Sequence, residues 1–135
     1  MKLPHNSYVA IVDGENFILM RNKGQPFEPS LELVAKPGLD PTNFSAGVRH
    51  QDDAGQQSGN TNLNELAHGA AAAGQLNRMA IAGEFEHIAI ISDPKILGEM
   101  RRHYHVELKN RLVGEIDKTL SGEPTNRIEK AILAA

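Results

Sequence analysis

The hydrophobic pattern in the first third of the chain predicts two short strands joined by a tight turn. Residues 7–13 (SYVAIVD) are rich in β-branched side chains and end at an Asp-Gly pair, and a second apolar run covers residues 16–21 (NFILMR). The connection between these runs is too short for a helix, so we expect an antiparallel hairpin. Residues 31–36 (LELVAK), which lie between two prolines, predict a third strand.

A long segment without periodicity follows these predicted strands. Residues 38–60 contain four glycines, three aspartates and three glutamines, with only scattered apolar positions. A structureless connection of this length inside a small domain is uncommon, and it is usually functional or disordered. We therefore predict a mobile loop over residues 38–60, with a tolerated surface insertion as the alternative.

The longest helical pattern in the chain covers residues 62–82. Apolar positions recur at helical spacing, Asn62 and Glu65 resemble a capping box, and Gly83 is a typical helix stop. The centre of this segment, residues 70–74, consists of alanine and glycine. Small side chains let backbones approach closely, so we expect this helix to pack directly on a sheet.

The C-terminal half predicts alternating strands and helices. Residues 87–92 (HIAIIS) form a continuous apolar run that is typical of a buried parallel strand, and Asp93-Pro94 then provides a cap and a first helical residue. The helix should continue to about residue 103. Right-handed crossovers then give a single α/β domain with a five-stranded mixed sheet of ribonuclease-H-like type, whose second strand is antiparallel. The remaining predicted elements are a short helix at 106–112, a more exposed strand at 113–118 and a helix that Pro124 opens.

Composition and charge exclude several classes of function. The chain has 135 residues and no cysteine, which excludes disulfides, thiolate catalysis and cysteine-based zinc sites. No apolar run could span a membrane and the first residues do not resemble a signal peptide, so we expect a cytoplasmic protein without a membrane partner. From Lys95 onward there are 8 basic and 6 acidic residues, against 6 and 11 before it. This surplus is too small for strong binding to duplex nucleic acid, although it permits a local contact.

Three sequence blocks resemble bacterial host-attachment proteins. They are residues 8–16 (YVAIVDGEN), 85–101 (FEHIAIISDPKILGEMR) and 114–120 (GEIDKTL). That family, which is named for the attachment of a plant-associated bacterium to host cells, is similar to the middle domain of archaeal and eukaryotic class I release factors and of the rescue factor Pelota. The resemblance implies the release-factor middle-domain fold. It also implies a binding or regulatory module whose partner is the ribosome or another protein.

The resemblance also implies a partner-binding loop. In release factors a Gly-Gly-Gln tip between the third strand and the first long helix enters the peptidyl-transferase centre, where the glutamine helps to position water. This implies that Gln56 is the candidate for hydrolysis of peptidyl-tRNA. However, alanine replaces the first glycine, and only one of the residues 38–60 is Lys or Arg, so we favour a binding module without enzymatic activity. The matching residues here are Ala54, Gly55, Gln56, Gln57, Ser58 and Gly59.

A metal-dependent nuclease is the other enzymatic alternative. Nucleases of the ribonuclease-H type hold Mg²⁺ with carboxylates that follow the first strand, lie on the first helix and follow the fourth strand. Asp13, Glu65 and Asp93 occupy loosely equivalent positions. Each also has a structural interpretation, because Asp13 precedes a turn glycine and the other two suit helix caps. We therefore predict no metal site and no cofactor.

Histidines provide two weaker candidates. His103 and His105 are two residues apart, a spacing that serves metals on a strand, but here they follow a predicted helix. His68 could act as a base, yet no nucleophile lies near it in a recognisable motif. We expect all three to have structural or surface roles.

Overall fold

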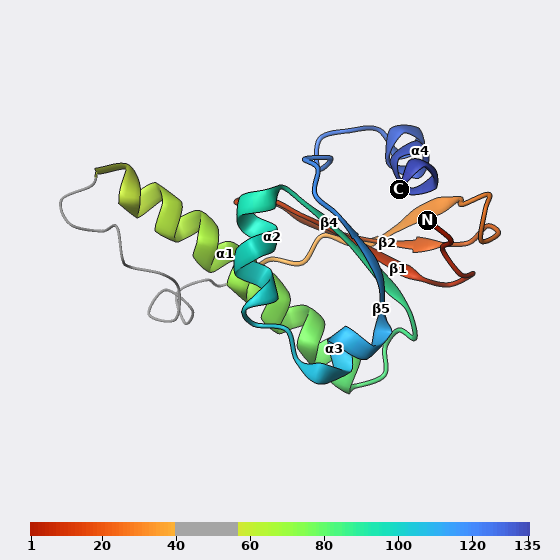
Figure 1. Ribbon diagram of the computed structural model, residues 1–135, viewed down its shortest axis with the longest axis horizontal. Coiled ribbons are helices and arrows are strands. Elements are labelled where there is room, and N and C mark those ends of the chain that lie inside the picture. Colours follow the sequence, from red (N-terminus) through yellow and green to blue (C-terminus); the bar gives the residue numbers. More distant parts are fainter. Residues whose placement is uncertain (40–56) are drawn as a thin grey trace.

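The computed structural model describes residues 1–39 and 57–135 and shows a mixed sheet covered by helices on both faces (Figure 1). The sheet has five strands in the order β3-β2-β1-β4-β5. This arrangement confirms the predicted α/β class and the five-stranded mixed sheet. The elements in chain order are β1 (Tyr8–Val12), β2 (Phe17–Asn22), β3 (Leu31–Ala35), α1 (Gln57–Ile81), β4 (Ile88–Ser92), α2 (Pro94–Arg101), α3 (Val106–Arg111), β5 (Leu112–Ile116) and α4 (Thr125–Ala134).

Strand β1 is the centre of the sheet and pairs on both sides. It is antiparallel to β2, with Ile11 opposite Ile18, which confirms the predicted hairpin. It is parallel to β4, with Val12 opposite Ser92, so both strands end at the same edge of the sheet. All five residues of β4 are buried, as expected for a parallel strand between two helical layers.

The alternation of side chains along the strands divides the core into two clusters. On one face, Ala10 and Ile90 pack with residues of α1, α2 and α3, including Leu76 and Leu97. On the other face, Ile11 and its neighbours pack against α4. Figure 1 shows the same division, with α1, α2 and α3 on one side of the sheet and α4 on the other.

Helix α1 begins earlier than the sequence pattern predicts. It starts at Gln57, so the predicted loop over residues 38–60 is wrong at its C-terminal end, and Gln57, Ser58 and Gly59 belong to the helix. The predicted capping box at Asn62 and Glu65 is wrong for the same reason. The first helical residues are polar and add nothing to the apolar periodicity, so the pattern placed the helix start where that periodicity begins. Residues 40–56 lie outside the described residues.

The end of α1 is as predicted. Gly83 adopts a positive φ of 73°, a conformation that glycine accepts without the steric penalty of a Cβ atom. The N–H of Glu84 donates to the carbonyl of Met79 at 3.0 Å, which satisfies one of the last helical acceptors. Within the part of the chain that the structure describes, no helix is long and apolar enough to cross a membrane.

Helices α1 and α2 cross closely at a glycine. A Cβ atom at Gly69 of α1 would lie 2.8 Å from Cγ2 of Ile96 on α2, which is shorter than real contacts allow. A Cβ atom at Gly98 of α2 would meet nothing within 4 Å. The packing of α1 on α2 therefore requires a glycine at position 69 but not at position 98.

These two glycines make a matched pair for a stability test. Gly69→Ala forces Ile96 to move, and we expect the free energy of unfolding to fall by about 1–3 kcal/mol. Gly98→Ala only improves helix propensity, and we expect a gain of about 0.5–1 kcal/mol. Urea unfolding of both variants measures the difference, and a gain in stability for Gly69→Ala would contradict the close crossing.

Candidate functional site

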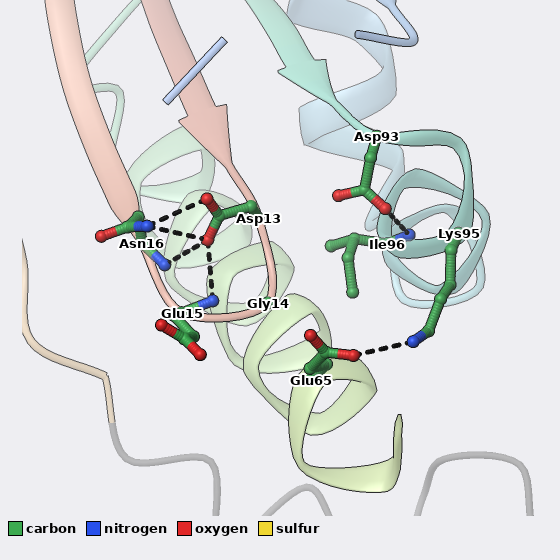
Figure 2. A pocket seen from close by; sticks show the side chains of 8 residues that line it. All are labelled: Asp13, Gly14, Glu15, Asn16, Glu65, Asp93, Lys95 and Ile96. Atoms are coloured by element: carbon green, nitrogen blue, oxygen red, sulfur yellow. Dashed lines mark hydrogen bonds and ion pairs between the residues drawn. The ribbon is translucent and has the colours of Figure 1, made fainter. Parts of the chain in front are cut away.

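A pocket of about 280 Å³ lies at the edge of the sheet where β1 and β4 end (Figure 2). Because these strands are parallel neighbours, the residues that follow them meet there. Asp13 follows β1, Asp93 follows β4, and Glu65 reaches the pocket from α1. The structure therefore brings together the three carboxylates that the sequence suggested as a nuclease site, and Glu15 and Lys95 also line the pocket.

The carboxylate of Asp13 holds the turn between β1 and β2. Its Oδ1 accepts hydrogen bonds from the backbone N–H groups of Glu15 at 2.7 Å and Asn16 at 2.6 Å, and the Asn16 side chain donates to Oδ2 at 2.9 Å. The hydroxyl of Ser121, which lies 108 residues away in sequence, also donates to Oδ2. Burial opposes ionisation of Asp13, but the hydrogen bonds from Ser121, Asn16 and the turn prevail and lower its pKa.

The other two carboxylates hold helix α2. Oδ2 of Asp93 accepts from the backbone N–H of Ile96 at 3.3 Å and caps α2, as the sequence predicts. Oε1 of Glu65 accepts from Nζ of Lys95 at 2.8 Å, so it links α1 to the first turn of α2. Figure 2 shows Asp13 directed toward Asn16 and Glu65 directed toward Lys95. Each carboxylate thus has a structural partner of its own.

The carboxylates that line the pocket are separated by their own structural contacts. Among residues 1–39 and 57–135, no three His, Asp or Glu side chains form a group that could hold a metal ion. The pocket has an excess of negative charge, with Asp13, Glu15, Glu65 and Asp93 against Lys95. Its carboxylates share a space, but they do not converge on one point in it.

The three candidate histidines also have separate partners. Nδ1 of His68 lies 2.8 Å from the carbonyl of Asp13, and since a carbonyl only accepts, this nitrogen carries the proton. Nε2 of His103 lies 2.8 Å from Oε2 of Glu99. Nδ1 of His105 accepts from the N–H of Glu107 at 3.0 Å and caps α3. His103 and His105 therefore serve different contacts.

The predicted partner-binding loop falls mostly outside the described residues. Ala54, Gly55 and Gln56 belong to the segment that the structure does not describe. Gln57, Ser58 and Gly59 are the first residues of α1. The proposed roles of these residues stay predictions.

Comparison with known proteins identifies a family that the chain matches over most of its length. A family model described as bacterial archaeo-eukaryotic release factor family 12 matches residues 6–132. This range includes every strand and nearly all of α4. No curated protein matches the chain.

The lowered pKa of Asp13 makes a testable contribution to stability. Because the folded protein favours the ionised form, this contribution is complete above the ordinary pKa of 3.8 and is lost as the pH falls below it. We expect Asp13→Asn to lower the free energy of unfolding by about 1–2 kcal/mol at pH 7. The difference from the wild-type chain should shrink in urea titrations below pH 4.

A double-mutant cycle with Ser121→Ala provides the control. The Ser121 hydroxyl donates to the Asp13 carboxylate, so the two substitutions together should cost less than the sum of their separate effects. Strict additivity, or a cost of Asp13→Asn that is constant from pH 7 to pH 3, would contradict this role.

Proposed function

Because the chain belongs to bacterial archaeo-eukaryotic release factor family 12, we propose that it is a release-factor-like binding module that associates with the ribosome. The observation that carries this proposal is the extent of the family match, from residue 6 to residue 132. The match includes every strand and all or nearly all of each helix. The family assignment therefore depends on the whole fold and not on a single motif.

The shape of α1 is consistent with this role. The helix has 25 residues, which corresponds to a length of about 37 Å, whereas the strands have five or six residues. Its N-terminal part extends beyond the sheet and beyond α2 (Figure 1). The segment that corresponds to the release-factor tip joins the chain at this projecting end. A surface that extends from the body in this way suits insertion into a larger partner.

The charge near this end of α1 is mixed. The first turn of the helix has no acidic residue, so the partial positive charge of the helix N-terminus is not offset within that turn. In the sequence, however, Asp52 and Asp53 precede the helix, and Arg49 is the only Lys or Arg among residues 38–60. The proposal therefore does not depend on the charge of this segment.

The proposal is one of binding without catalysis. Ala54 stands where release factors have the first glycine of their tip, and alanine resists the positive φ angles that glycine adopts. The pocket carboxylates, which were the other catalytic candidates, have structural partners. The sequence also resembles bacterial host-attachment proteins. An effect on host attachment would then be an indirect consequence of a role in translation.

Co-sedimentation with ribosomes tests the proposal. We expect the full chain to be recovered with 70S particles or subunits at about 150 mM salt, because a specific surface contact survives screening at short range. The ribosome-free fraction and an unrelated acidic protein of similar size serve as controls. Absence of the chain from the ribosomal fractions even at low salt would contradict the proposal.

Peptidyl-tRNA hydrolysis by Gln56 is the second candidate. It is favoured by the position of the Gly55-Gln56 pair, which directly precedes α1 as the Gly-Gly-Gln tip precedes the first long helix in release factors. A release assay on ribosomes with formyl-methionyl-tRNA distinguishes the two functions, with Gln56→Ala as the variant and Gln57→Ala as the matched control. We expect no release above background from the wild-type chain. Release that Gln56→Ala abolishes and Gln57→Ala retains would establish the enzyme instead.

A further inference from the structure

Positive charge in this acidic protein is concentrated in one short segment. Residues 95–111 contain five Lys or Arg and two Glu, a net charge of +3, whereas the whole chain has −3, so the remaining residues sum to −6. This segment consists of most of α2, all of α3 and the connection between them. It lies beside α1, on the face of the sheet opposite α4 (Figure 1).

The first glutamate of the segment lies beneath an arginine. Glu99 is buried, with 2% of its side chain exposed, and both of its carboxylate oxygens accept from Nη1 of Arg102 at 2.9 Å. The side chain of Arg102 is 38% exposed. Within the described residues, Nε and Nη2 of Arg102 contact no protein acceptor. Glu99 therefore holds the guanidinium group through Nη1, and the other nitrogens can donate to solvent or to a ligand.

A second carboxylate repeats this arrangement. Oε1 of Glu115 accepts from Nε and Nη2 of Arg101 at 3.0 and 2.7 Å, and Oε2 accepts from the hydroxyl of Tyr104 at 2.7 Å. Arg101 is 56% exposed while Glu115 is 18% exposed. Burial, together with the hydrogen bond to Glu115, raises the pKa of Tyr104, so its hydroxyl stays a donor. The carboxylates therefore orient the two arginines, and an approaching partner meets mainly the cations.

The connection between α2 and α3 is fixed by α1. Nδ2 of Asn77 donates to the carbonyl of His103 at 2.7 Å, and its Oδ1 accepts from the N–H of His105 at 2.9 Å. Since Nδ1 of the exposed His105 accepts the cap bond, its neutral ring carries the proton on Nε2, which is a further donor. Lys109 is exposed on the next turn.

A glycine without a packing role lies among these cations. Gly98 is three residues after Lys95 and four before Arg102, spacings that place all three on one side of α2. A Cβ atom there would meet nothing within 4 Å, although glycine inside a helix costs about 1 kcal/mol relative to alanine. A bare stretch of backbone between cations allows a close approach by an anionic chain.

From this combination we infer that the outer side of α2 and α3 binds the phosphate backbone of ribosomal RNA. This inference rests on the proposed association with the ribosome. Of the large exposed hydrophobic residues that the structure describes, only Val106 lies in this segment, so the surface lacks the apolar core of a protein interface. Oriented guanidinium groups are instead suited to phosphate. We call this the α2–α3 surface, consisting of Lys95, Gly98, Arg101, Arg102, His105 and Lys109.

Two charge-matched double variants test the α2–α3 surface. Arg101→Gln/Lys109→Gln removes two cations from it, and Arg127→Gln/Lys130→Gln removes two exposed cations from α4 on the opposite face. Each variant changes the net charge from −3 to −5. Binding to a fluorescent fragment of ribosomal RNA is measured by anisotropy at several salt concentrations, and thermal unfolding verifies that each variant is folded.

We expect Arg101→Gln/Lys109→Gln to bind the RNA fragment roughly tenfold more weakly at about 100 mM salt. The plot of the logarithm of the association constant against the logarithm of the salt concentration should also be less steep, with a slope smaller in magnitude by about 1.5–2. The α4 variant should bind within about twofold of the wild-type chain. Gly98→Leu, which keeps the charge and fills the bare stretch, should also weaken binding. Equal losses in both double variants, or competition by polyglutamate as strong as that by RNA, would overturn the inference.

Ribosome co-sedimentation of the same variants separates this inference from the proposed function. If the wild-type chain and Arg101→Gln/Lys109→Gln sediment equally with ribosomes, the α2–α3 surface is not the contact and the proposed function stands. If the wild-type chain does not sediment but binds the RNA fragment through the α2–α3 surface, the RNA-binding surface stands and ribosome association fails.

Discussion

The parallel pairing of β1 with β4 is the constraint on which the rest of the structure depends. A parallel pair needs a crossover, and α1 provides it across one face of the sheet. The pairing also makes both strands end at one edge, so the turn at Asp13 and the start of α2 at Asp93 become neighbours. Helices α2 and α3 then pack against α1, and the surface on their outer side takes its position from this one pairing.

Carboxylates in this protein stabilise structure in two different ways. Around the pocket, Asp13 and Asp93 accept backbone N–H groups and hold a turn and a helix start. Glu99 of α2 and Glu115 of β5 hold arginines whose side chains remain partly exposed. The first arrangement keeps a set of carboxylates from converging on a ligand. The second makes cations rigid, so less side-chain entropy is lost when an anion binds.

Much of the fold could be predicted from local sequence signals. The Asp-Gly pair after the first apolar run predicted the hairpin, and the Asp93-Pro94 pair predicted the start of α2, because turns and caps depend on residues close in sequence. The start of α1 was missed because its first turn is polar. A projecting helix has no apolar face to bury there, so periodicity carries no information about where it begins.

The candidate site and the α2–α3 surface were harder to predict because they depend on tertiary contacts. The predicted topology suggested that Asp13, Glu65 and Asp93 lie close together, and all three line one pocket. Their hydrogen-bond and ion-pair partners, which the sequence alone does not reveal, give each of them a structural role. Ser121 reaches Asp13 from a distant segment that has no local signal. Glu99 looks like an exposed helical residue in the sequence, and only the packing of α2 shows that it is buried beneath Arg102.

We propose that the chain binds the ribosome and directs its α2–α3 surface at RNA. A cryo-EM reconstruction of ribosomes saturated with the full chain would show this arrangement. We expect density for the domain on the ribosome, with α2 and α3 against an RNA backbone and α4 directed away from it. Density in which α4 contacts the RNA while α2 and α3 face solvent, or no density for the chain at saturating concentration, would rule out this binding mode.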